Sequence, residues 1–180
     1  MSRQLDLAWG ERREPPEPEW ARVPDPVTGP LYLVSCVSQK SGAAAPARDL
    51  YQSDWFRKAR AYVEALGARW MILSAKHGLL EPSKVIEPYD TMLAAQSKRQ
   101  REVWGCWVVD ELLYHVADTG QIVILAGSVY RDAILSSQLF RARGYRAAVP
   151  MEGLGIGEQK AWLIRETAEI ERQKSQKSAI

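Results

Sequence analysis

Short apolar runs alternate with longer segments of helical periodicity from residue 31 onward, and this alternation limits the possible folds more than any other feature. The apolar runs are brief and continuous, as expected of strands that helices cover on both faces. They span residues 31–37, 69–74, 121–126 and 146–150. Strands separated by helices form a parallel sheet with right-handed crossovers. The sequence therefore predicts an α/β protein, a three-layer α/β/α domain around a four-stranded, mainly parallel sheet.

The segments between and after these runs predict helices at residues 53–67, 95–117, 129–144 and 158–174. The first helix has the clearest ends, because Ser53 can cap its N-terminus and Gly67 can stop it. For the second helix, the apolar spacing predicts a buried side that carries Val103, Trp107, Val108, Leu112 and Val116.

Residues 1–30 differ from the rest, because they combine most of the chain's prolines with many charges. Proline fixes φ and removes a backbone donor, so this segment is expected to be an extended arm, with Trp9 and Trp20 as candidate anchors. The chain has 180 residues, of which 46% are hydrophobic and 26% charged, the composition of an ordinary globular protein. We expect a single α/β domain over residues 31–180.

Several classes of function are disfavoured by composition. The net charge of +2 gives no global basic field, so a nucleic-acid partner would need local basic patches. Cys36, Cys106 and the two histidines lack metal-ligand spacing, and neither a P-loop nor a GxGxxG motif occurs, so no metal and no cofactor are expected. The first residues are charged, and no apolar run approaches the ~18 residues of a membrane span. The sequence predicts a cytoplasmic, reduced protein with no membrane partner.

Ligands of parallel sheets bind outside the carboxyl ends of the strands, so the loops there are the candidate site. Each of these loops is small, polar or glycine-rich. The candidate substrate-binding residues in and beside them are Ser35, Ser38, Gln39, Lys40, Tyr51, Ser74, Lys76, Gly78, Tyr89, Ser128, Arg131 and Gly153. The first loop could be a polar clamp for a base or a phosphate, or an ordinary turn with a surface lysine.

Three residues are candidates for acid-base chemistry. His77 could serve as a general acid or a phosphate donor, since imidazole titrates near neutral pH, or could have a purely structural role. Asp90 follows Tyr89, whose ring could stack on a base. The alternative for this pair is a tyrosine that packs the loop and an aspartate that caps the next helix. Glu152 is the second candidate carboxylate.

A short basic run, residues 97–101, contributes Lys98, Arg99 and Arg101 as candidate contacts to a DNA backbone. Each phosphate that such a residue neutralises makes binding more salt-dependent. The alternative is a solvated helix surface.

Four separated blocks resemble, in order, a bacterial family of unknown function, DUF6884: LVSCVSQKSG, LYQSDWFRKARAYVE, LSAKHGLLEPSKVIEPYDTML and PMEGLGIGEQKAWL. The resemblance covers roughly residues 31–165 and leaves out the proline-rich arm. The chain is more distantly similar to the peroxide-stress family YaaA, which shares a GLL…PY core. Its strand order and loops also resemble the uracil-DNA glycosylase superfold.

A further resemblance is to small antiphage DNA glycosylases that excise glucosylated hydroxymethylcytosine. This resemblance implies hydrolysis of the N-glycosidic bond of a modified base flipped out of double-stranded DNA. It does not carry over catalytic residues position by position, so Asp90, Glu152 and His77 would have to take the catalytic roles from other positions. The chain departs from the uracil enzymes, because it has neither GQDPYH after the first strand nor HPSP after the fourth. Two alternatives therefore stay open: a DNA-binding stress protein without catalysis, and an enzyme acting on a free nucleoside or nucleotide.

Overall fold

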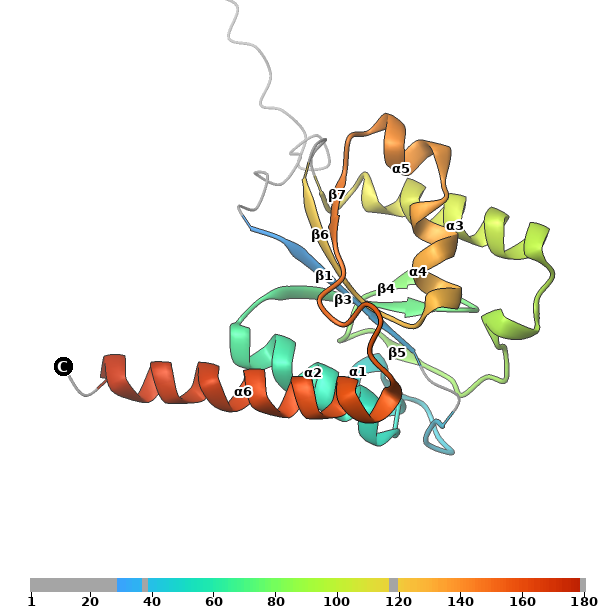
Figure 1. Cartoon of the computed structure of the whole chain (residues 1–180). Coiled ribbons are helices and arrows are strands. Elements are labelled where there is room, and N and C mark those ends of the chain that lie inside the picture. The colour runs from blue at the N-terminus through green and yellow to red at the C-terminus, as the bar shows by residue number, and fades with distance from the viewer. Residues whose placement is uncertain (1–28, 37–38, 117–119, 179–180) are drawn as a thin grey trace, which may run out of the picture.

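The computed structural model describes residues 29–36, 39–116 and 120–178, so nearly all of the expected arm lies outside the described part. Its centre is a five-stranded sheet in the order β4-β3-β1-β6-β7 (Figure 1). Four strands are parallel: β1 (Leu31–Ser35), β3 (Arg69–Ser74), β6 (Gln121–Leu125) and β7 (Arg146–Ala148). They are the four predicted strands, so the mixed α/β class and the mainly parallel sheet are confirmed.

The expectation of four strands was wrong, because β4 (Gly78–Leu80) adds an antiparallel edge strand to β3. The strand follows a tight turn over residues 75–77, and its first residue, Gly78, has a φ of 64°. So short a run carries no period of its own that a sequence pattern could reveal. A separate two-stranded sheet pairs β2 (Ala45–Pro46) with β5 (Val85–Ile86).

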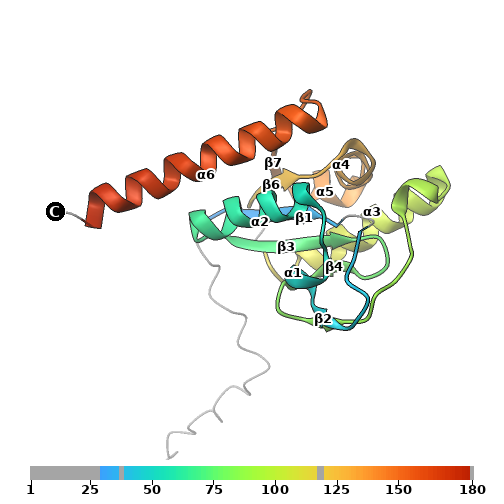
Figure 2. The ribbon, with the colours of Figure 1, turned by 90° about the horizontal axis from the view of Figure 1, so that it is seen from below.

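Helices cover both faces of the large sheet. On one face lie α1 (Ala47–Leu50), α2 (Asp54–Leu66) and α6 (Ile156–Ser178), with α6 packed along α2 (Figure 2). On the other face lie α3 (Lys98–Leu112), α4 (Ser128–Leu135) and α5 (Gln138–Ala142). Successive strand residues alternate between these layers: in β1, Leu33 packs toward α3 and Val34 toward α2. This is the three-layer arrangement that the sequence predicts.

Most helix ends follow local chemistry. The Ser53 hydroxyl accepts a hydrogen bond from the Phe56 amide at 3.1 Å, and Gly67 ends α2 with a φ of 64°, as predicted. A capping box between Ser97 and Gln100 starts α3 after a short 3₁₀ turn, η2 (Leu93–Ala95), so this helix is shorter than expected. The predicted helix at 129–144 is broken into α4 and α5 around residues 136–137.

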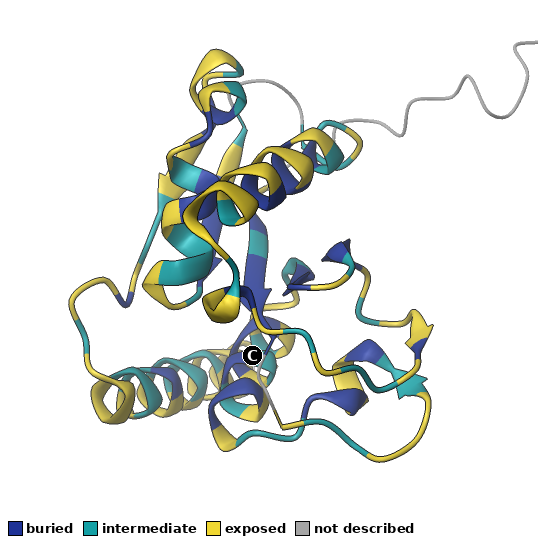
Figure 3. Cartoon of the chain, turned by 90° about the vertical axis from the view of Figure 1, so that its right-hand side faces the viewer, coloured by how far each residue is buried: buried dark blue, intermediate teal, exposed yellow. Residues whose placement is uncertain are grey.

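The buried side of α3 differs from the prediction. Val108 and Leu112 are fully buried, but Val103 is 64% exposed and Trp107 42% exposed. The helix instead packs through Trp104 and its neighbours on the same side, because the hydrogen side chain of Gly105 lets α3 approach α4 closely. Exposed residues run along the outside of α3 (Figure 3).

Within the described residues, no helix is both long and apolar enough to cross a lipid bilayer.

Candidate functional site

The order of the strands creates a switch point beside β1. The chain leaves β1 for β3 through helices on one face, and leaves β3 for β6 through α3 on the other. Ligands of parallel sheets commonly bind at such a switch point, outside the carboxyl ends of the strands. Cys36 directly follows β1 and Tyr130 lies in the first turn of α4, and their Sγ and Oη atoms are 3.1 Å apart.

Three tyrosines, one serine and one cysteine form a connected group at this switch point, which we call the phenol cluster: Cys36, Tyr51, Ser74, Tyr89 and Tyr130. The Tyr89 hydroxyl is central, at 2.8 Å from the Tyr51 hydroxyl and 2.7 Å from Ser74 Oγ. It also donates a longer contact to Cys36 Sγ at 3.7 Å. The cluster joins residues that lie up to 94 positions apart in the sequence.

Different elements deliver these side chains. Ser74 is the last residue of β3, and Tyr51 directly follows α1 and forms an isolated antiparallel bridge with Lys40. Tyr89 comes from the loop after β5, which Pro88 stiffens because its ring fixes φ. Tyr130 is further fixed by an edge-on contact with the ring of a tryptophan, Trp104, with centroids 5.3 Å apart.

Burial controls the ionisation of the cluster. Burial, followed by the neighbouring Cys36, raises the pKa of Tyr51 to about 12. The same two causes, again with burial first, raise the pKa values of Tyr89 and Tyr130 well above the ordinary tyrosine range. All three phenols therefore keep their protons at neutral pH and are available as hydrogen-bond donors.

We expect these phenols to ionise late in an alkaline titration followed by phenolate absorbance. Because their folded-state pKa values are raised, their contribution to stability is complete below about pH 10. It is lost as the pH rises through the folded-state pKa, which for Tyr51 is about 12. Tyr89→Phe should remove part of the late step. The exposed Tyr114→Phe is the matched control and should leave that step intact, and an identical loss in both variants would contradict the assignment.

Two lysines from different loops flank the ring of Tyr89. Lys40 Nζ lies 4.3 Å from the centroid of this ring and 5.9 Å from that of Tyr51, and Lys76 Nζ lies 5.6 Å from the Tyr89 centroid. Each ammonium group gains a cation–π attraction from the ring. Their convergence also makes this part of the carboxyl edge of the sheet positive, which favours an anionic ligand.

His77 packs edge-on against Tyr89 with ring centroids 5.2 Å apart, and its backbone amide donates to Ser74 Oγ at 3.0 Å. Among the described residues, its Nε2 atom is buried without a hydrogen-bond partner. Burial lowers the pKa of His77, with smaller contributions from Lys76 and Lys84. The neutral ring leaves a nitrogen that can accept a hydrogen bond, and acid catalysis by His77 would require a nearby anion to restore its proton.

Several of the predicted substrate-binding residues converge on the cluster or border it: Lys40, Tyr51, Ser74, Lys76 and Tyr89, together with the acid-base candidate His77. Ser35 is buried at the end of β1, and Gln39 uses its backbone carbonyl to accept from the Gln52 amide at 2.9 Å. Ser38 lies outside the described residues.

The other predicted residues lie elsewhere along the carboxyl edge. Gly78 packs beneath Trp107 and Glu111, with its backbone turned by a positive φ. Gly153 is exposed, in a turn with a φ of 79°. Asp90 is exposed and adjoins the cluster's central tyrosine in sequence.

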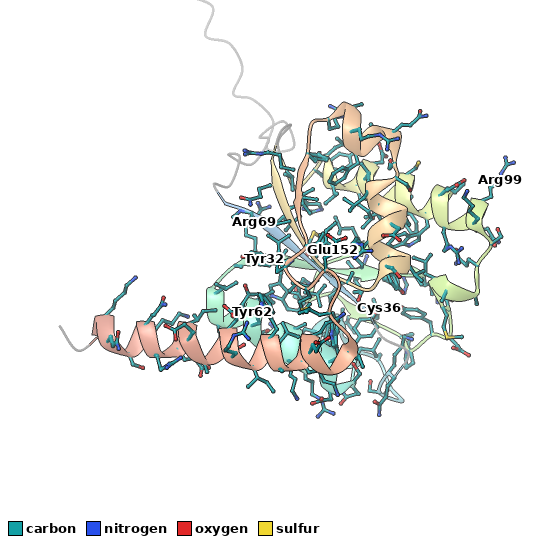
Figure 4. All side chains as sticks on the ribbon, viewed as in Figure 1. Tyr32, Cys36, Tyr62, Arg69, Arg99 and Glu152 are labelled. Carbon is teal, nitrogen blue, oxygen red and sulfur yellow. The ribbon has the colours of Figure 1, made fainter. Side chains whose placement is uncertain are left out.

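Glu152 follows β7 and reaches back across the edge to α4. Its Oε1 lies 3.4 Å from Arg131 Nη1, while Arg131 Nε also contacts Asp132 Oδ1 at 2.9 Å. The Glu152 side chain is 67% exposed. Figure 4 shows Glu152 and Cys36 near one end of the sheet and Arg69 toward the other.

The side chains of the basic run, residues 97–101, point in two different directions. A cleft of about 500 Å³ lies between the start of α3 and α4, and Lys98, Arg101 and Ser128 are among its lining residues. Arg99 points away from the body of the protein (Figure 4). Sequence reasoning grouped these residues because a run of charges does not reveal which side of a helix each one takes.

Cys36 and Tyr130 are cluster members that sequence reasoning did not select. A usable signal existed for both, because Cys36 is the first residue after β1 and Tyr130 lies in the first turn after β6.

No group of three or more histidine, cysteine or carboxylate side chains that could hold a metal ion occurs in the described part of the chain.

Comparison with known proteins gives a family but no activity. No curated protein matches the chain. The family of unknown function DUF6884 matches residues 31–165, which include every strand of the large sheet and the whole phenol cluster. The chain therefore belongs to the DUF6884 family, whose function is unknown.

Proposed function

We propose that this protein is a DNA N-glycosylase that holds a flipped, modified base at the phenol cluster. The observation that carries the proposal is the ring of Tyr89, flanked by Lys40 and Lys76 at the switch point of the sheet. A flipped nucleotide presents an aromatic base beside a phosphate. In this proposal the two ammonium groups move from the ring of Tyr89 to the phosphate, which frees the ring to stack on the base, and the neutral phenols donate to the polar edge of the base.

The proposed reaction is hydrolysis of the bond between C1′ of the sugar and the base nitrogen. Water oxygen bonds to C1′, the base leaves with the electron pair of the broken bond, and the water proton passes to a carboxylate. A carboxylate near C1′ also stabilises the positive charge that develops on the sugar. Asp90 is placed in this role because it adjoins Tyr89, with Glu152 as the second candidate. Both are exposed without DNA, and bound DNA would cover them.

In this proposal the DNA backbone runs along the cleft between α3 and α4. Charge removal by Arg101→Gln should flatten the dependence of log Kd on log salt concentration by about one unit. Arg99→Gln should leave the slope unchanged, since this side chain points away from the cleft. Fluorescence anisotropy of duplex DNA over a salt series measures both slopes. Equal slopes for wild type and Arg101→Gln would show that Arg101 does not contact the DNA backbone.

The decisive experiment incubates the protein with duplex DNA that carries glucosylated hydroxymethylcytosine, as in modified phage genomes, and detects abasic sites by alkaline strand cleavage. Unmodified duplex and free nucleoside monophosphate are tested in parallel. We expect abasic sites only in modified DNA, and their loss in Lys40→Gln/Lys76→Gln. Release from the free nucleotide alone would favour a nucleotide hydrolase.

A binding protein without catalysis is the second candidate, and the exposure of both carboxylates favours it. An active-site carboxylate of a hydrolase is commonly shielded from bulk water by the protein itself. If duplex DNA binds but no modified base is released, the phenol cluster is a recognition site and the glycosylase proposal fails.

A further inference from the structure

The outer side of α3 carries an apolar stripe that is largely exposed among the described residues, although one edge of Trp107 packs on Gly78. Val103 is 64% exposed and Trp107 is 42% exposed, one helical turn apart. Cys106 lies between them and is also exposed. Arg99 and Asp110 fall on the same side, one turn before and after. We name these five residues the α3 outer face. A contiguous exposed apolar patch can mark an interaction surface.

The charges of α3 run against its own dipole. The first turn holds Lys98, Arg99 and Arg101 and no acidic residue, while Asp110 and Glu111 lie in the last turn, which holds no basic residue. A helix is stabilised by the opposite arrangement, with anions at its N-terminus and cations at its C-terminus. The sequence of α3 therefore keeps an unfavourable pattern that an external partner could offset.

Some of these charged side chains have interaction partners within the protein. Glu102 lies 4.0 Å from Lys98, and the Glu111 carboxylate accepts from the amide that follows Gly78 at 2.6 Å, which also protects the edge of β4. Arg99 and Asp110 form no ion pair with any described residue. Arg99 and Asp110 stand at opposite ends of the apolar stripe.

We propose that the α3 outer face binds a second copy of this chain, with the two α3 helices antiparallel across a two-fold axis. Such an interface is self-complementary, because each contact occurs twice. With Arg99 opposite Asp110 of the second copy, Val103 faces Cys106 and Trp107 across the axis. The positive Arg99 in the first turn of each helix then meets the negative Asp110 in the last turn of the other, whereas Lys98 lies toward the cleft between α3 and α4. One helix face is a small contact area, so the dimer is weak and concentration-dependent.

Charge reversal tests this pairing, measured as the dimer fraction of the full chain by analytical ultracentrifugation over a concentration series. Arg99→Asp and Asp110→Arg should each weaken dimerisation by at least about tenfold, which corresponds to about 1.4 kcal/mol. The double variant should restore it, and so should an equimolar mixture of the two single variants, because opposite charges then face each other again. Lys98→Asp is the matched control, with the same charge change in the same turn, and should dimerise like wild type.

Cys106 supplies an independent geometric test. Its Sγ lies 3.8 Å from Ser137 Oγ, a weak contact that leaves the residue exposed. In the proposed register the two Cys106 residues are offset by about three residues, or about 4.5 Å along the axis. The axes of the two helices are about 8–10 Å apart, so a short bismaleimide can reach from one Cys106 residue to the other. Cross-linking should trap a covalent dimer through Cys106, since Cys36 is only 7% exposed. Cys106→Ser should abolish trapping without reducing the dimer fraction in ultracentrifugation.

Three outcomes would overturn the proposal. The first is a monomer at every concentration, and the second is a dimer that Arg99→Asp does not weaken. The third is a Cys106 thiol that is protected from a monofunctional maleimide to the same extent at every protein concentration. Protection of that kind would mean that a segment of the same chain, such as the N-terminal arm, covers the α3 outer face. The release of modified bases plays no part in these measurements, so they stand whatever the outcome for the proposed glycosylase.

Discussion

Replacing Gly105 with alanine is expected to lower Tm by about 10 °C, through a loss of about 3 kcal/mol in the free energy of unfolding. A Cβ atom at this position would overlap the carbonyl oxygen of Ala133 and lie 2.6 Å from its carbonyl carbon. Both are backbone atoms of α4, so no side-chain rotation relieves the overlap. The helices α3 and α4 would have to separate, which would open the core beneath them.

Gly157→Ala is the matched control, because Gly157 also lies in a helix and no atom comes within 4 Å of the position that a Cβ atom would take there. Alanine has the higher helix propensity, so this variant should keep or slightly raise Tm. Thermal unfolding followed by circular dichroism measures both changes. If Gly105→Ala proved as stable as wild type, the close approach of α3 and α4 would be incorrect.

Gly105 also explains the main error in reading the fold from sequence. A glycine inside a helix usually weakens it, and nothing in the local pattern marks it as the point where another helix crosses. Sequence spacing placed Val103 and Trp107 on the buried side, whereas contact at Gly105 turns the helix toward Trp104; Val108 is buried as predicted. The parallel strands were predictable because both of their faces are buried, which produces continuous apolar runs.

The part of the site that could be predicted is the part whose position follows from the order of the strands. Lys40, Ser74 and His77 lie at or after the carboxyl ends of strands, and the strand order brings those ends together. The distribution of the basic run between two sides of α3 was not predictable, because it depends on how the helix is rotated. Nor does sequence reveal that Cys36 and Tyr130 meet, since a contact across 94 positions arises only from the folded sheet.

Asp90→Asn is expected to lower the single-turnover rate of base release by about 100-fold or more while changing DNA affinity little. The substitution keeps the size of the side chain and removes its charge. A carboxylate that stabilises a developing sugar cation acts mainly in the transition state, so its loss reduces kcat rather than binding. The measurement is release of the modified base at saturating protein, with DNA affinity measured separately by anisotropy.

Two further variants separate the roles of the candidate carboxylates. Glu152 is held by Arg131 at 3.4 Å, so Glu152→Gln removes an ion pair at the rim and should reduce the rate less than Asp90→Asn. Glu171→Gln changes an exposed carboxylate on α6 and controls for the loss of one negative charge, and should react like wild type. A full rate with Asp90→Asn and a collapse with Glu152→Gln would transfer the catalytic role to Glu152. Full rates in both variants would show that neither carboxylate acts on the sugar, and the reaction would then need a different group at the phenol cluster.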